Sequence, residues 1–145
     1  MATQTTYSAY TQALANCLTT ELNALANAAA SAAGSAQDNT TNLDLWGDFE
    51  LAVTFGSNPT AASTIDLYLI ASVDGTNYAD SAVLPVTALV GSFVLRAVTT
   101  AQLVHVLRVP LLPGKFKMAV LNNSGQSFPA SGSTVKMRTY HLTTT

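Results

Sequence analysis

Short runs of alternating apolar and polar residues begin at Leu43 and continue to the end of the chain. In LDLWGDFELAVTF, residues 43–55, apolar side chains hold one parity, and the other parity holds three acids: Asp44, Asp48 and Glu50. A period of two is typical of a half-buried strand. The same alternation predicts strands in TIDLYLIAS, GSFVLRAV, QLVHVLRV, KFKMAVLN and STVKMRTYHL. A further strand in SAVLPVTALV would be confined by Pro85 to a sheet edge or a bend.

These six or seven strands are separated by turn-forming segments such as PLLPG and NNSGQSFPASG, and no helical pattern follows residue 42. Parallel sheets need crossover connections that are usually helical, so the strands are expected to pair antiparallel. The sequence therefore predicts a mainly β protein, with a single antiparallel β-sandwich over residues 42–145. Strand number alone leaves a jelly-roll and an immunoglobulin-like topology both open.

Residues 1–41 follow another pattern and are predicted to form an N-terminal arm. Four leucines recur at the spacing of one helical stripe: Leu14, Leu18, Leu22 and Leu25. Two tyrosines, Tyr7 and Tyr10, extend this stripe, which predicts a helix over residues 8–28 followed by an extended segment. Because so narrow a stripe cannot form a core alone, the first three leucines are candidate contacts with the following domain or another subunit.

Charged residues make up only 10 % of the chain, against roughly 25 % in an ordinary soluble domain. Small neutral residues replace them, which suits a surface covered by neighbouring subunits and predicts a homo-oligomer. The net charge of −2 argues against a nucleic-acid partner, and no apolar run is long enough for a membrane helix. Cys17 is the single cysteine, so an internal disulfide is excluded, and a small apolar role in a reducing cytoplasm is expected.

The charges are segregated along the chain. All eight acids precede residue 81, and all six bases follow residue 95. If the strands around residues 115–118 and 135–138 form a hairpin, one face carries four bases: Lys115, Lys117, Lys136 and Arg138. Asp44, Asp48 and Glu50 would form an acidic counterpart, and the two patches would direct head-to-tail contacts between copies. In the simpler alternative, acidic and basic strands pair side by side within one copy.

No residue pattern in the sequence indicates an enzyme. Nucleophile elbows, phosphate loops and dinucleotide fingerprints are absent from the sequence, and His105 and His141 lack partner motifs for zinc. We expect no catalytic residues, no metal and no cofactor, and a plain turn in DGTNYAD, where a calcium site would need more oxygen ligands. An alternative use of the aromatic residues is a sugar platform formed by Trp46, Tyr68 and Tyr78.

Three stretches resemble small structural proteins of tailed bacteriophages: DNTTNLDLWGDFELAV, DLYLIASVDGTNYAD and HVLRVPLLPGKFKMAVLNNSGQ. The resemblance covers about residues 36–140 and implies a virion component, often a β-sandwich that decorates or cements the capsid. It transfers no site residues, and it includes no part of the N-terminal helix predicted above.

The leading hypothesis is a capsid decoration or cement protein, made in the host bacterial cytoplasm and located in the virion. Its expected partners are copies of itself and the major capsid protein or other virion proteins. The alternatives are a carbohydrate-binding module of a tail or fibre and a tail, connector or baseplate component.

Overall fold

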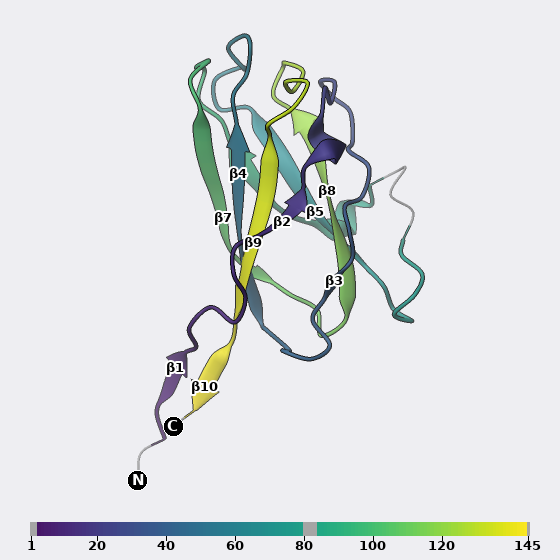
Figure 1. The fold of residues 1–145 in the computed structure, drawn as a ribbon, viewed down its shortest axis with the longest axis vertical. Coiled ribbons are helices and arrows are strands. Elements are labelled where there is room, and N and C mark those ends of the chain that lie inside the picture. The colour runs from purple at the N-terminus through teal and green to yellow at the C-terminus, as the bar shows by residue number, and fades with distance from the viewer. Residues whose placement is uncertain (1–2, 80–83, 145) are drawn as a thin grey trace.

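The computed structural model describes residues 3–79 and 84–144, which form ten strands and no α-helix (Figure 1). The predicted mainly β architecture is confirmed. The strands are β1 Thr5–Tyr7, β2 Ala15–Leu18, β3 Gln37–Asp38, β4 Trp46–Val53, β5 Thr64–Ala71, β6 Leu89–Val94, β7 Gln102–Pro110, β8 Lys115–Asn123, β9 Thr134–Tyr140 and β10 Leu142–Thr144. Two short 3-10 turns complete the chain, η1 Thr20–Leu22 and η2 Val86–Ala88.

The strands form two four-stranded sheets and one small ribbon, and every pair is antiparallel as predicted. The first sheet has the order β2-β9-β4-β7, the second sheet β3-β8-β5-β6, and the terminal ribbon joins β1 to β10. Pairing is nested: β1 pairs β10, β2 pairs β9, β3 pairs β8, β4 pairs β7 and β5 pairs β6. The chain thus runs out and back as one long ribbon, and contacts of β4 with β9 and of β5 with β8 complete the two sheets.

Alternate residues of both sheets meet in one apolar core. Phe49 and Leu51 of β4, Leu67 of β5, Phe116 of β8 and Val135 of β9 are all almost completely buried. Burying a side chain of this size stabilises the fold by about 1.5–3 kcal/mol. The alternation in the sequence therefore identifies the inner faces of these strands correctly.

The predicted helix over residues 8–28 is wrong. This segment contains β2, which pairs with β9, and the turn η1. Leu18 and Leu22 enter the core, whereas Leu14 stays 37 % exposed. Strand pairing satisfies the otherwise open edge of β9, and this tertiary gain outweighs the helix propensity of an Ala-rich segment.

The segment after residue 28 packs on the second sheet. It runs antiparallel along the edge of β8, where Ala28, Ser31 and Gly34 donate backbone hydrogen bonds of 2.6–2.9 Å to Asn122, Val120 and Met118. A Cβ on Gly34 would clash with the carbonyl oxygen of Cys17, so glycine permits this close approach to β2. Both β2 and β3 precede residue 42, and both are edge strands of the sheets.

The segment SAVLPVTALV gives η2 and the start of β6 after Pro85, while its residues 81–83 lie outside the described residues. In the described part of the chain, no helix is long and apolar enough to cross a membrane.

Candidate functional site

The four bases predicted to share one face are divided between the two sheets. β8 carries Lys115 and Lys117 in the second sheet, whereas β9 carries Lys136 and Arg138 in the first. The hairpin on which a shared basic face depends is not formed, because the connection between β8 and β9 crosses from one sheet to the other. Each strand finds its pairing partners far away in the sequence, β8 in β3 and β5 and β9 in β2 and β4.

The bases pair with groups of the same chain. The ammonium of Lys115 lies 3.9 Å from the Asp38 carboxylate, and that of Lys136 lies 4.0 Å from Glu50. The Lys117 ammonium stands 4.5 Å from the centre of the Tyr78 ring. Acidic and basic strands thus lie side by side, which was the simpler of the two sequence alternatives. Exposed ion pairs of this kind stabilise a fold by about 0–1 kcal/mol each.

The three predicted acids also separate. Asp48 and Glu50 stand on the outer face of β4, as predicted, but Asp44 precedes the strand and is 1 % exposed. Leu43, the residue before Asp44, has a φ of 50°, so the chain turns here and Asp44 is not part of the alternating strand β4. The Asp44 carboxylate accepts hydrogen bonds from the Thr11 hydroxyl and, at 2.8 Å, from Nδ1 of His141.

The predicted sugar platform is not formed. Trp46 opens β4 in the first sheet, whereas Tyr68 lies on β5 of the second sheet and is 7 % exposed. Tyr78 lies in the β5–β6 connection, beside Lys117. Trp46 instead contacts aromatic residues from the two ends of the chain: its ring centre lies 6.2 Å from that of Tyr7 and 5.8 Å from that of Tyr140.

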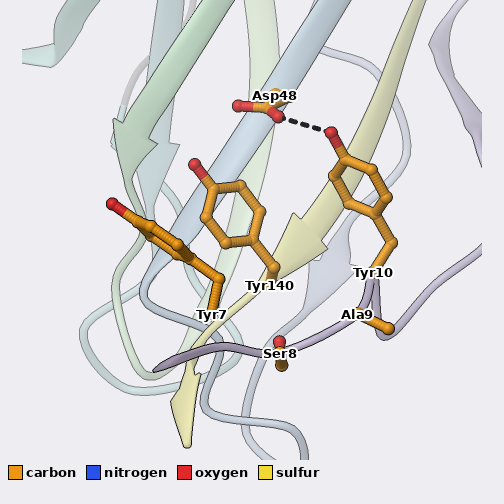
Figure 2. A pocket seen from close by; sticks show the side chains of 6 residues that line it. All are labelled: Tyr7, Ser8, Ala9, Tyr10, Asp48 and Tyr140. Atoms are coloured by element: carbon orange, nitrogen blue, oxygen red, sulfur yellow. Dashed lines mark hydrogen bonds between the residues drawn. The ribbon is translucent and has the colours of Figure 1, made fainter. Parts of the chain in front are cut away.

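These end residues enclose an aromatic recess of about 370 Å³ on the outer face of the first sheet. It is lined by Tyr7, Ser8, Ala9, Tyr10, Asp48 and Tyr140 (Figure 2). The ring of Tyr140 lies between the other two tyrosines, at 5.9 Å from Tyr7 and 5.7 Å from Tyr10, with interplanar angles of 66° and 88°. Figure 2 shows the Ser8–Ala9 backbone running between the two flanking tyrosines and Asp48 at the opposite side.

Hydrogen bonds fix the segment that carries Tyr7 and Tyr10. The backbone N–H of Ser8 donates to the carbonyl oxygen of His141 at 2.9 Å, and the N–H of His141 donates to the Ser8 hydroxyl at 3.0 Å. Three residues after Ser8, the N–H of Thr11 donates to the carbonyl oxygen of Thr139 at 2.9 Å. The recess therefore forms where the N-terminal segment is hydrogen-bonded to the end of β9 and to the residue before β10.

One carboxylate links the recess to the sheet. The hydroxyl of Tyr10 donates to Oδ2 of Asp48 at 2.8 Å, and the N–H of Arg108 donates to Oδ1 at 2.9 Å. The bond to Asp48 raises the pKa of Tyr10, with burial and the charge of Asp48 adding to the effect. Arg108 has a φ of 59° at the irregular step in the pairing of β4 with β7, and Asp48 satisfies its N–H there.

A second recess of about 410 Å³ adjoins the first. Tyr10 and Asp48 border both, and the remaining lining residues are Leu14, Phe49, Glu50, His105, Leu107 and Arg138. The guanidinium of Arg138 lies 5.1 Å from the centre of the Tyr10 ring, and Nε2 of His105 lies 3.3 Å from Glu50. The outer face of β9, β4 and β7 is thus a continuous groove with aromatic, aliphatic and charged parts.

Sequence reasoning missed this groove because Tyr7 and Tyr10 were read as an extension of a helical leucine stripe. The available signal was the position of the aromatic residues, since four of the six tryptophan and tyrosine residues lie near the two chain ends or at the start of β4: Tyr7, Tyr10, Trp46 and Tyr140. Only the nested pairing, which places Tyr7 opposite Leu142, brings the two ends together.

The remaining polar candidates have local roles. In DGTNYAD, the Asp74 carboxylate accepts bonds from the N–H groups of Thr76 and Asn77 and from the Asn77 amide, which hold its pKa well below the usual range. Asp80 lies outside the described residues. Within residues 3–79 and 84–144, no group of three His, Cys, Asp or Glu side chains is placed to hold a metal ion.

Comparison of the chain with protein-family models, with curated proteins and with solved structures gave no match.

Proposed function

We propose that the protein is a non-enzymatic structural component of a bacteriophage virion, a capsid decoration or cement protein with a jelly-roll sandwich. In this proposal it assembles with copies of itself and with the coat protein. The nested strand pairing is the observation that carries the proposal, together with the resemblance of three sequence stretches to phage structural proteins.

The strand order supports the jelly-roll assignment over the immunoglobulin-like one. In the two main sheets, β2 to β9 pair first with last, second with second-last, and so on inward. The resulting orders, β2-β9-β4-β7 and β3-β8-β5-β6, are those of an eight-stranded ribbon rolled into two layers. Jelly rolls of this kind recur in viral capsid proteins and lectins, although a fold alone never fixes a function.

The end of the molecule that bears the terminal ribbon supports a role in assembly. Figure 1 shows the ribbon projecting from the two sheets beside the β3–β4 and β7–β8 turns. These turns carry three leucines that are 46–54 % exposed, Leu43, Leu45 and Leu112, here called the end patch. Asn39 ties the turns together by donating to the carbonyl oxygens of Asp44 and Leu112, each at 2.8 Å. Exposed apolar residues gathered in this way mark contact surfaces.

The test is to locate the protein in purified particles and to measure its copy number relative to the major coat protein. Hundreds of copies support decoration, whereas about a dozen or fewer favour the tail, connector or baseplate alternative. Absence from the particles would contradict a virion role altogether.

The end patch is tested with the double variant Leu45→Asp/Leu112→Asp. We expect its binding to empty shells to fall at least about tenfold, since two charges would have to be buried at the contact. The control is Leu103→Asp, whose side chain is 59 % exposed near the start of β7, at the opposite end of that strand from the β7–β8 turn. Equal shell binding by the double variant and the control would exclude the end patch as the contact.

A further inference from the structure

We infer that the aromatic recess binds a saccharide, with one pyranose ring seated between Tyr7 and Tyr10 against Tyr140. The inference is independent of where in a virion the protein is located. It rests on the shape of the recess, on the free hydrogen-bonding capacity at its rim and on the balance of charge around it.

The shape suits a sugar ring. Three tyrosine rings bound the recess, and the two flanking rings lie steeply to the ring of Tyr140, at 66° and 88°. A pyranose presents C–H groups that pack against aromatic faces, while its hydroxyl groups point to the rim. The volume of about 370 Å³ falls near the lower end of the roughly 300–1,000 Å³ typical of ligand pockets.

The rim supplies the polar groups that a sugar needs. Asp48 accepts one hydrogen bond at each carboxylate oxygen, from Tyr10 and from Arg108. An ionised carboxylate offers about four acceptor sites, so about two remain for sugar hydroxyls. The hydroxyl of Ser8 accepts from His141 and keeps its own proton to donate. Positions of the donors and acceptors are fixed before any ligand arrives, which lowers the entropic cost of binding.

The charges argue against the other ligand that aromatic boxes take, a quaternary ammonium group. Two guanidinium groups stand next to the recess, Arg138 at 5.1 Å from the Tyr10 ring and Arg108 at 6.0 Å from the Trp46 ring. Asp48 is the one acid among the residues that line the recess. Because these guanidinium groups already lie beside the Tyr10 and Trp46 rings, they would repel a second cation, whereas a neutral saccharide has no such penalty.

The second recess extends the site. Because it shares Tyr10 and Asp48 with the first, a unit linked to the seated ring would lie along Glu50, His105 and Arg138. We therefore assign the groove to an oligosaccharide of at least two units. The expected result is tighter binding of a disaccharide than of the matching monosaccharide.

The experiment is a glycan array followed by saturation-transfer NMR with the glucose, galactose and N-acetylglucosamine monosaccharides and their disaccharides. Wild-type protein is expected to bind at least one glycan, with saturation transferred to ring protons. Tyr7→Ala and Tyr10→Ala should each weaken binding about tenfold, and the double variant should abolish it. Both side chains are at least half exposed, at 58 % and 50 %, so these variants are expected to fold.

The matched control is Tyr78→Ala, which removes a tyrosine from the other side of the molecule and should leave affinity within about twofold of wild type. Trp46, the single tryptophan, contacts Tyr7 and Tyr140, so its fluorescence gives a second readout. Two results overturn the inference: no glycan bound above the double variant, or a glycan bound equally well by the wild type and a double variant whose circular dichroism is native.

Discussion

The outer faces of the two sheets differ in what covers them. On the second sheet, Ile70 is 0 % and Tyr68 7 % exposed, although neither belongs to the core between the sheets. The protein covers this face itself, since η2 packs against β5 and Tyr78 lies beside Lys117. On the first sheet, Tyr10 and Leu107 are 50 % and 63 % exposed and border open recesses.

The difference shows two uses of apolar residues outside a core. Those on the second sheet are buried, with η2 packed against β5, and add to stability. Those around the aromatic recess are held in place by backbone and side-chain hydrogen bonds, from Ser8 to His141 and from Tyr10 to Asp48, yet remain accessible. A chain with so few charged residues keeps such an accessible surface only at some risk of self-association, which favours a binding role for the recess.

The largest expected effect comes from truncating equivalent aliphatic residues on the two faces. Ile70→Ala should lower the free energy of unfolding by about 3 kcal/mol, because it removes methylene contacts and leaves a cavity under the connection. Leu107→Ala, at a position 63 % exposed, should change it by less than about 0.5 kcal/mol. Urea denaturation of both variants measures the two values. Similar losses at the two positions would mean that the faces are equally covered.

A smaller effect is expected where the N-terminal segment is attached to the first sheet. Asp44→Asn removes the charge that accepts from Thr11 and His141, both of which hold this segment and β10 in place. Hydrogen bonds to a charged group contribute about 1.5–3 kcal/mol, so a loss of about 2 kcal/mol is expected at pH 7. The backbone bonds of residue 44 with the Asn39 side chain remain available in the variant.

The pH dependence gives the sharper measurement. Burial alone raises the pKa of Asp44, but the bonds from Thr11, Thr139 and His141 outweigh it and leave the pKa below its usual value. A depressed pKa in the folded state means that the stabilisation is present above the unfolded pKa and is lost as pH falls through the folded pKa. The stability gap between the wild type and the variant should therefore close in strong acid. A gap that stays constant between neutral and strongly acid pH would show that Asp44 acts through packing alone.

The strands could be predicted from the sequence because alternation is a local property. The run from Trp46 to Val53 buries every second residue, as its alternation of apolar and polar side chains indicates. The helix over residues 8–28 was wrong because β2, which carries Leu18, pairs with β9, more than 100 residues away, and Leu22 is buried in the turn η1 that follows. A leucine spacing of four indicates that one side of the segment is buried, but it does not show whether the segment is a helix or a strand.

The candidate site was harder to predict because its parts come from distant segments. The prediction of one basic patch was wrong because β8 and β9 belong to different sheets. The prediction of a sugar platform was wrong because Tyr68 is buried on β5. Tyr7 and Tyr140 are 133 positions apart and meet only because pairing is nested from the chain ends inward. The sequence shows which aromatic residues lie near the chain ends, but it does not show that they meet in one recess.

The smallest expected effect concerns two tyrosines, one on each outer face. The pKa of Tyr10 is raised first by its hydrogen bond to Asp48, whereas the pKa of Tyr68 is raised first by burial and only second by the charge of Asp66. Asp48→Asn should therefore return the pKa of Tyr10 most of the way to its ordinary value of about 10. Asp66→Asn should leave most of the increase at Tyr68 in place.

The measurement is an NMR titration of tyrosines labelled at Cζ, with assignments from single Tyr→Phe variants. Tyr10 is half exposed, so little besides Asp48 keeps its neutral form favoured, while Tyr68 stays under the β5–β6 connection whatever its neighbouring charge. If Asp66→Asn lowers the pKa of Tyr68 as far as Asp48→Asn lowers that of Tyr10, water reaches both faces, and the covered face is not covered in solution. If neither variant moves its tyrosine, the bond that joins Tyr10 to Asp48 is not formed in solution, and the recess loses the link that fixes its Tyr10 side.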